Sequence, residues 1–288
     1  MSTNLEIILV GIIACFACAI PGVFLVLRGM SMMTDAISHT VLLGITIGFF
    51  IANDLNSPLL IIFAIIVGLI TVWLTELLHQ TNLLSKDSAI GIVFPLFFSS
   101  AVILISKFAK NVHLDVEHVV FGEMAFIPFD RFETENYDFG PKALIILLII
   151  FIVNLIIVLL FYKELKISTL DYDYARIIGF SPIFLNYLLM SMVSVTSVGT
   201  FQSIGVILVI SFMTGPALTA RLLTDKLSIM IIYSLLIGSI SSVVGYFLAI
   251  YFDVSISGMQ ATIIGVVFLI TLLISPKKGI LKSKLYKL

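Results

Sequence analysis

The chain has 288 residues, of which 60% are hydrophobic and 11% charged, and its mean hydropathy is +1.20. This composition excludes an ordinary soluble domain, in which roughly a quarter of the residues are charged. Apolar runs of about the 20 residues that a helix needs to cross the hydrocarbon core recur along the chain. The sequence therefore predicts an all-α, polytopic membrane protein with a single membrane domain over residues 1–288. The net charge of −1 favours no class of partner.

The apolar runs between polar breaks predict nine spans. The divisions near residues 30 and 199 have no long polar loop, so a count of eight stays open. The amino terminus lacks the basic segment and cleavage site of a secretory signal, and the first run is expected to persist as a span. Cys15 and Cys18 form a C-x-x-C inside that apolar run, where packing is favoured over metal binding. The predicted spans lie near residues 5–27, 34–52, 58–79, 88–106, 141–163, 183–198, 200–220, 227–252 and 257–275.

The distribution of basic residues predicts the orientation of these spans. Cytoplasmic loops of membrane proteins carry an excess of Lys and Arg. Placing the lysine-rich carboxyl tail inside puts twelve of the sixteen Lys and Arg residues inside and the amino terminus outside. This orientation predicts that residues 107–140 are extracellular, with seven carboxylates between Asp115 and Asp138, and that residues 166–182 are cytoplasmic.

Asp35 and His39 are polar residues in an otherwise apolar stretch, four positions apart. Side chains at i and i+4 share one face of a helix, within reach of a common ion. A carboxylate and an imidazole together suit a divalent transition metal such as manganese, iron or zinc. The alternative is that the chain turns near residue 33, so that Asp35 is an exposed helix cap and His39 an interfacial polar group. A broken helix that dips into the bilayer also fits the apolar stretch 29–33.

Residues 166–182 predict a short helix between two spans. Asp171 can cap it, Asp173 favours its amino end, Gly179 can close it, and Pro182 begins the next element. Such a helix offers a contact for another protein, whereas an amphipathic connector on the headgroups is the alternative.

Two further polar groups are candidate sites. Residues 191–205 are rich in hydroxyls, which either let helices pack closely or line a pathway, and packing is favoured. These candidates are Ser194, Ser197, Gln202 and Ser203. The segment "HLDVEHVVFGE" predicts an acidic docking surface in preference to a metal site, formed by Asp115, Glu117, His118 and Glu123. The chain has no G-x-x-x-x-G-K-[ST] motif and therefore no nucleotide-binding P-loop of its own.

Five segments in order resemble the ABC-3 family of permeases, the membrane subunits of ATP-binding-cassette importers for manganese, zinc or iron. Together they span roughly residues 20 to 225. Thr34 stands where a glycine is usual in the family and Leu43 where a proline is common. The segments are "LRGMSMMTDAISHTVLLGITIGFF", "KDSAIGIVFPLFFS", "DVEHVVFGE", "LDYDYARIIGF" and "QSIGVILVISFMTGPALTARLL".

The resemblance implies a fold similar to a reduced vitamin B12 or siderophore importer permease, in a bacterial plasma membrane. It implies a second copy of the same permease, a cytoplasmic ATPase dimer and an extracellular metal-binding lipoprotein as partners, with no nucleic acid and no permanently bound cofactor. The chain itself is then not an enzyme. The family's DAxSH motif falls on Asp35 and His39, which become the expected metal ligands. The expected ATPase-coupling residues are Asp171, Tyr172, Asp173, Tyr174, Ala175, Arg176 and Gly179.

The sequence therefore predicts the permease subunit of an importer for a divalent metal, with manganese favoured over zinc or iron. Two alternatives stay open. A secondary transporter driven by protons or sodium would need no ATPase partner. A siderophore or heme importer would share the architecture but would have a wider cavity without paired metal ligands.

Overall fold

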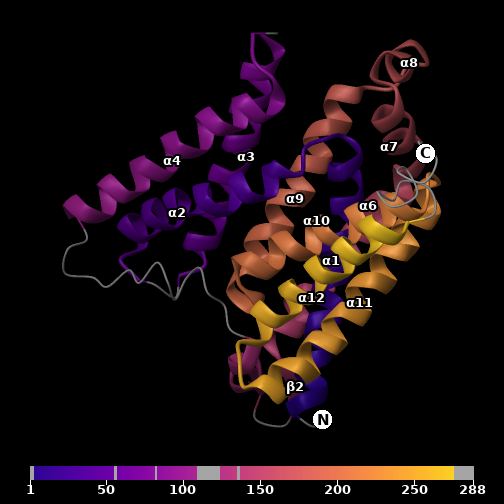
Figure 1. Ribbon diagram of the computed structural model, residues 1–288. Coiled ribbons are helices and arrows are strands. Elements are labelled where there is room, and N and C mark those ends of the chain that lie inside the picture. The colour runs from indigo at the N-terminus through magenta and orange to yellow at the C-terminus, as the bar shows by residue number, and fades with distance from the viewer. Residues whose placement is uncertain (1–2, 55–56, 82, 109–123, 135–136, 276–288) are drawn as a thin grey trace.

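The computed structural model describes residues 3–54, 57–81, 83–108, 124–134 and 137–275 (Figure 1). Nine helices within these ranges are long and apolar enough to cross a membrane, which confirms the preferred count. They are α1 (Thr3–Leu27), α2 (Met32–Ala52), α3 (Leu59–Gln80), α4 (Lys86–Phe108), α6 (Lys142–Leu160), α9 (Pro182–Ile204), α10 (Val206–Leu223), α11 (Leu227–Phe252) and α12 (Ile256–Ile274).

Short elements mark the two ends of the bundle. The helices α7 (Tyr162–Leu170) and α8 (Tyr172–Ile177) extend beyond α6 at one end, called the α8 end here. At the other, the hairpin end, a 3₁₀ turn η1 (Met124–Phe129) precedes the antiparallel strands β1 (Arg131–Thr134) and β2 (Tyr137–Pro141). This hairpin is not among the elements predicted from the sequence. Figure 1 shows α7 and α8 at the top and β2, beside the amino terminus, at the bottom.

The helices form two groups joined by α9. On one side α2, α3 and α4 pack against one another, and on the other α1 packs against α6, α10 and α11, with α12 covering α10 and α11. Helix α9 contacts both groups, and Figure 1 shows it between them. Most of α1 is buried, so this helix forms the centre of the second group.

Small residues let the helices approach closely. A β-carbon on Gly22 of α1 would overlap the backbone carbonyl of Met213 in α10, and one on Gly44 of α2 would overlap the backbone of α3 at Phe63 and Ala64. Close backbone approach at small residues is a common means of helix association in lipid. Helices α2 and α3 are therefore held together as a closely packed pair.

The two divisions that lacked polar loops have different outcomes. Helix α1 ends at Leu27, where Gly29 has a φ of +67° and the Met30 N–H donates to the Leu25 carbonyl at 3.0 Å. The division predicted near residue 30 is therefore confirmed, and the alternative of a turn near residue 33 is wrong. The division predicted near residue 199 is confirmed as a break between two helices, but its position is wrong, because α9 continues through Ile204 and the break falls at Gly205, with a φ of +80°.

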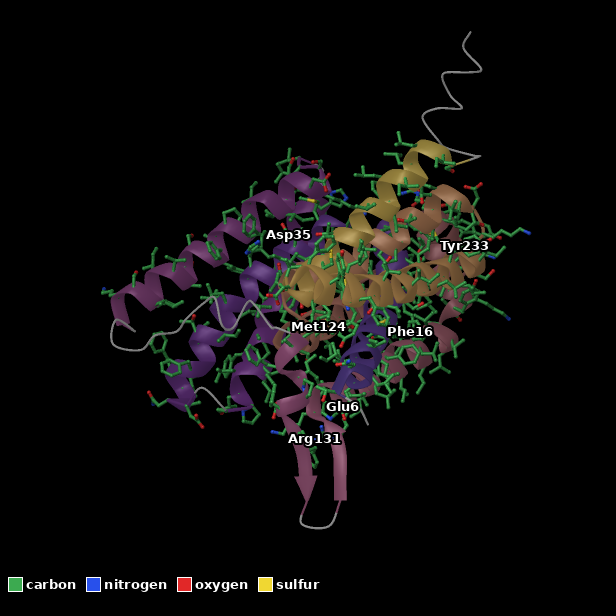
Figure 2. The ribbon with its side chains drawn as sticks, turned by 60° about the horizontal axis from the view of Figure 1, so that its bottom comes forward. Glu6, Phe16, Asp35, Met124, Arg131 and Tyr233 are labelled. Atoms are coloured by element: carbon green, nitrogen blue, oxygen red, sulfur yellow. The ribbon has the colours of Figure 1, made fainter. Side chains whose placement is uncertain are left out.

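An ion pair with a buried carboxylate anchors the hairpin end (Figure 2). The two terminal guanidinium nitrogens of Arg131 donate to the two carboxylate oxygens of Glu6, at 3.1 and 3.2 Å, and Glu6 is only 2% exposed. Asp130 pairs with Lys142 at 2.6 Å. A bidentate pair fixes orientation as well as distance, so β1 is fixed to the first turns of α1.

Candidate metal-ion site

Asp35 and His39 lie on one face of α2, in its first two turns. The His39 Nε2 atom is 3.6 Å from the Asp35 Oδ1 atom, and each side chain is 43% exposed. Ser31 occupies the position before the helix, and Asp35 lies inside the first turn. The idea that Asp35 is a helix cap is therefore wrong. The two donor atoms are close enough to bind one ion together.

The surroundings of His39 leave one flank of the pair open. Its ring lies against two rings of α4, with centroid separations of 5.3 Å to Phe94 and 5.7 Å to Phe98. These aromatic contacts restrict how the imidazole can rotate. The remaining exposure of both side chains leaves their donor atoms accessible from outside the chain.

Hydrogen bonds on the buried face of α2 hold this helix in place. The Thr34 hydroxyl donates to the Met213 sulfur of α10 at 3.1 Å, and the Thr71 hydroxyl of α3 donates to the Thr40 hydroxyl at 3.0 Å. Thr34 is thus a buried contact between helices at the position where the resembling family usually has glycine. The donor pair therefore projects from a helix that is fixed on its opposite side.

A single copy supplies only part of a coordination shell. Within the described ranges, no three His, Cys, Asp or Glu side chains gather closely enough to hold a metal ion. Both cysteines are free and buried within α1, and a side chain on Gly238 of α11 would meet the Cys15 sulfur. The accessible donors are thus one carboxylate and one imidazole, a set without thiolate.

The predicted coupling helix is present as α8, and its ends are closed as expected. The Asp171 carboxylate accepts a hydrogen bond from the Tyr174 N–H at 2.9 Å. After the helix, Gly179 has a φ of +90° and the Phe180 N–H donates to the Ala175 carbonyl at 3.0 Å. These are an N-cap and a glycine-closed carboxyl end.

Most of α8 is exposed. Tyr172 is 49% exposed, Tyr174 53% and Ile177 81%, whereas Ala175 is buried beneath them. The exposed members of the predicted coupling set are Asp171, Tyr172, Asp173, Tyr174, Arg176 and Gly179. Aromatic and aliphatic side chains at the tip of the α8 end are suited to contact with another protein.

Arg28 is a central residue of the α8 end that no sequence pattern had marked as a candidate site. Its guanidinium donates to Thr169 at 3.1 Å, to Ser168 at 2.9 Å and to Asn186 at 2.9 Å. The Asn186 amide in turn donates to the Glu76 carboxylate at 3.2 Å. Burial lowers the pKa of Arg28 to about 10, partly opposed by the charge of Glu76, so the guanidinium is protonated at pH 7. This Arg28 network joins α1, α3, α7 and α9.

The other candidate residues have different placements. Ser194 and Ser197 are fully buried in α9, and the Ser194 hydroxyl fills the space beside Gly68 of α3. Ser203 is 9% exposed. This burial is compatible with helix packing, while lining of a pathway stays a prediction. The side chain of Gln202 and the predicted docking residues Asp115, Glu117, His118 and Glu123 lie outside the described part of the structure.

The fold defines a multi-pass α-helical membrane protein. Comparison with known families then identifies it further: residues 2–275 match the ABC 3 transport family, and the chain belongs to this family of ABC transporter permeases. The resemblance inferred from the five sequence segments is thereby confirmed.

Similar proteins cover nearly the whole chain. The manganese transport system membrane protein MntD of Bacillus subtilis is 42% identical, over 99% of this chain and 96% of its own length. The zinc transport system membrane protein TroD of Treponema pallidum is 44% identical, over 97% of this chain and 76% of its own length. The chain is therefore similar to permeases named for two different metals.

Solved structures confirm the fold. A chain of PsaBC from Streptococcus pneumoniae, in complex with Fab, is 29% identical and superimposes with a TM-score of 0.78, over 99% of this chain and 96% of that one. A metal-chelate type ABC transporter in an inward-facing conformation has a TM-score of 0.61 at 19% identity, covering 86% of that chain, and supports the fold alone. The expected likeness to ABC permeases therefore holds.

Proposed function

We propose that this chain is the membrane subunit of an importer for a divalent transition metal, and that manganese is its principal substrate. The observation that carries the proposal is the Asp35–His39 pair, whose donor atoms lie 3.6 Å apart on an accessible face of α2. Oxygen and imidazole donors without thiolate suit manganese, iron and zinc alike, so the choice of manganese rests on the similarity to known permeases. The similarity to a manganese permease over almost the full length adds support.

Two copies of the chain would complete the site. Each copy offers one carboxylate and one imidazole, so a pair offers up to four protein ligands to an ion that otherwise keeps its waters. Because one flank of the Asp35–His39 pair is exposed, a partner copy can approach it. Partial coordination keeps binding weak enough for release, which transport requires.

The α8 end is assigned to the cytoplasm, and residues 107–140 to the outside. Lys163, Lys166, Arg176, Arg221 and Lys226 all lie at the α8 end, in agreement with the excess of basic residues in cytoplasmic loops. In this orientation α8 meets the ATPase dimer, and the hairpin end meets a metal-delivering protein.

The mechanism begins with delivery of the ion from outside to the space between two copies. Asp35 and His39 of each copy replace part of its hydration shell. Closure of the ATPases on ATP then displaces α8, and the Arg28 network transmits this movement to α1, α3 and α9. The donor pairs separate, and the ion leaves toward the cytoplasm.

Uptake into vesicles tests this function. Vesicles that contain the chain and its ATPase should accumulate manganese only when ATP is supplied on the ATPase side, and a siderophore or heme should not compete. Metal content measured element by element gives the selectivity among manganese, zinc and iron. Accumulation driven by a proton or sodium gradient without ATP would contradict the proposal, as would competition by a chelate.

The cap of α8 provides a separate test of coupling. Asp171→Ala should reduce ATP-driven uptake several-fold, because loss of an N-cap costs about 1 kcal/mol and α8 is only six residues long. Asp171→Asn retains an acceptor for the Tyr174 N–H and should transport nearly normally. Co-purification of the ATPase measures the contact directly. Equal uptake and equal ATPase recovery in the two variants would contradict a role for α8.

A further inference from the structure

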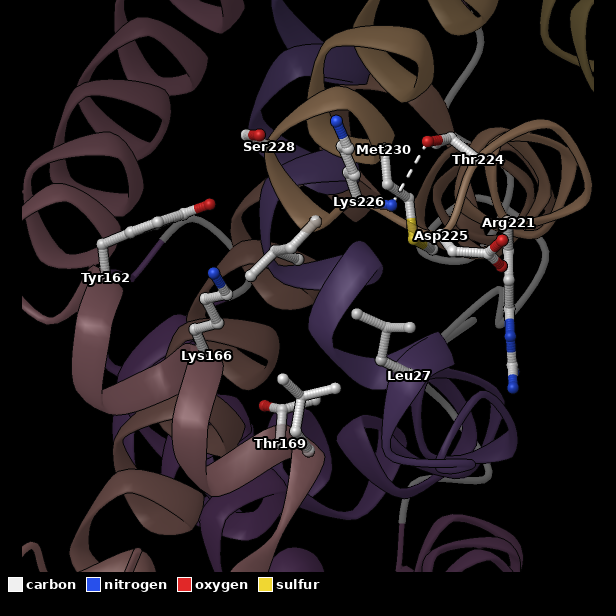
Figure 3. Close-up of a pocket in the computed structure, with 12 residues that line it drawn as sticks. Leu27, Tyr162, Lys166, Thr169, Arg221, Thr224, Asp225, Lys226, Ser228 and Met230 are labelled. Atoms are coloured by element: carbon white, nitrogen blue, oxygen red, sulfur yellow. Dashed lines mark hydrogen bonds between the residues drawn. The ribbon is translucent and has the colours of Figure 1, made fainter. Parts of the chain in front are cut away.

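A cavity of about 540 Å³ lies at the α8 end, between α7 and the connection from α10 to α11 (Figure 3). Tyr162 and Lys166 of α7 line one side, and Thr224 and Lys226 line the other. The end of α1, at Leu27, contributes to its wall. This space, called the α7–α11 pocket, is separate from the Asp35–His39 pair and from α8.

The pocket lies at the depth where membrane-spanning helices end. Leu27 is the last residue of α1, Arg221 lies in the last turn of α10, and Leu227 is the first residue of α11. These three helices are candidate spans, so their common boundary marks the transition from hydrocarbon to headgroups. A ligand in the pocket would be at the level of lipid headgroups.

The charges in the pocket favour an anion. Its described lining holds three cations, Lys166, Arg221 and Lys226, and one carboxylate, Asp225. Arg221 donates to the Val26 carbonyl at 3.2 Å. Among the residues that the structure describes, no carboxylate forms an ion pair with Lys166 or Lys226. Two ammonium groups from opposite walls are thus available for a ligand.

The remaining lining distinguishes between kinds of anion. Leu27, Leu170, Leu227 and Met230 provide apolar surface beside the cations. A free phosphate ion would use only the cations, whereas a phospholipid also presents glycerol and methylene groups to apolar surface. Basic pockets between membrane helices are known to bind anionic headgroups. The combination of depth, charge and apolar wall therefore favours a lipid.

We propose that the α7–α11 pocket binds the phosphate group of an anionic phospholipid, held between Lys166 and Lys226. This inference does not depend on which metal the protein carries. Occupation would brace α7 against α10 and α11, next to the Arg28 network, because Thr169 belongs both to that network and to the pocket lining. The lipid composition of the membrane would thereby affect coupling.

Lipid-dependent stability of the purified full-length chain tests the proposal. Dioctanoyl phosphatidylglycerol should raise the melting temperature in a saturable way, while dioctanoyl phosphatidylcholine and inorganic phosphate at the same concentrations should not. In Lys166→Gln/Lys226→Gln the half-saturating concentration should rise at least about tenfold, since each basic residue near a membrane surface contributes about a fivefold factor in affinity. Lys86→Gln/Lys163→Gln removes two charges outside the pocket and should behave like the unaltered chain.

Several outcomes would overturn the proposal. Equal stabilisation by both lipids would remove the requirement for an anion. Stabilisation by inorganic phosphate alone would identify a free ion as the ligand. An unaltered half-saturating concentration of phosphatidylglycerol in Lys166→Gln/Lys226→Gln would exclude the two lysines as ligands of the phosphate group. If that variant does not fold, Lys166→Arg/Lys226→Arg should retain the lipid effect, and its loss there would count equally against the proposal. If Lys166→Gln/Lys226→Gln loses ATPase co-purification but binds lipid as before, the pocket is a contact site for a protein and not for a lipid.

Discussion

Asp35→Asn/His39→Gln should abolish manganese uptake while ATPase co-purification stays unchanged. The two substitutions keep side-chain size and remove the anionic oxygen and the imidazole nitrogen. Loss of partners beyond the first coordination shell already lowers metal affinity by about 10- to 100-fold, so loss of both ligands should leave no measurable transport. Initial rates of uptake into vesicles, over a range of manganese concentrations, provide the measurement.

Asp87→Asn/His79→Gln is the matched control, because it alters the same residue types away from the site. Its uptake should equal that of the unaltered chain. Each single variant at Asp35 or His39 should raise the manganese concentration needed for half-maximal uptake, since one donor per copy remains. Normal uptake by the double variant, with the protein folded and bound to its ATPase, would refute the assignment of these residues.

Arg28→Met should uncouple ATP hydrolysis from transport. The variant leaves the Ser168, Thr169 and Asn186 side chains without their charged donor, so the hydrogen bonds that join Arg28 to α7 and α9 are lost. Hydrogen bonds to charged groups contribute about 1.5–3 kcal/mol each, and the free energy of unfolding should fall by at least about 2 kcal/mol. The informative measurement is the number of manganese ions transported per ATP hydrolysed by the folded protein.

Two other variants distinguish the hydrogen-bonding geometry of the Arg28 guanidinium from its positive charge. The measurement is again the number of manganese ions transported per ATP hydrolysed. Arg28→Lys retains the positive charge, but one ammonium cannot reproduce the planar, three-partner geometry, so the coupling ratio should recover only in part. Lys163→Met removes an exposed cation of α7 and should leave the ratio unchanged. A normal ratio in Arg28→Met, despite lower stability, would show that Arg28 has only a structural role.

The membrane-spanning helices were predictable because lipid imposes a simple rule. Each span must satisfy its own backbone and must be apolar over about 20 residues, and both requirements are visible in sequence. The ends of α8 were equally predictable, because Asp171 and Gly179 act on backbone groups a few positions away. The shared face of Asp35 and His39 follows from helical periodicity alone.

Features that depend on tertiary contacts were not predictable. The partners of Arg28 lie 140, 141 and 158 positions away, so no local pattern identifies them. The break between α9 and α10 could have fallen at either of two nearby glycines, and the helix continues past Gly199 to Gly205. The bidentate contact of Arg131 with Glu6 likewise joins distant segments.

The short connection between α1 and α2 has a mechanical consequence. Four residues separate these helices, and the hydrogen bond from Met30 to Leu25 closes the turn. Such a short, closed turn limits how far α1 can shift relative to α2. Because Arg28 lies at the start of this turn and Asp35 just beyond its end, we expect a displacement of Arg28 to be accompanied by a displacement of Asp35. A small tilt of α7 would then move Arg28 through its hydrogen bonds to Ser168 and Thr169, and the short turn would pass this movement to the Asp35 carboxylate.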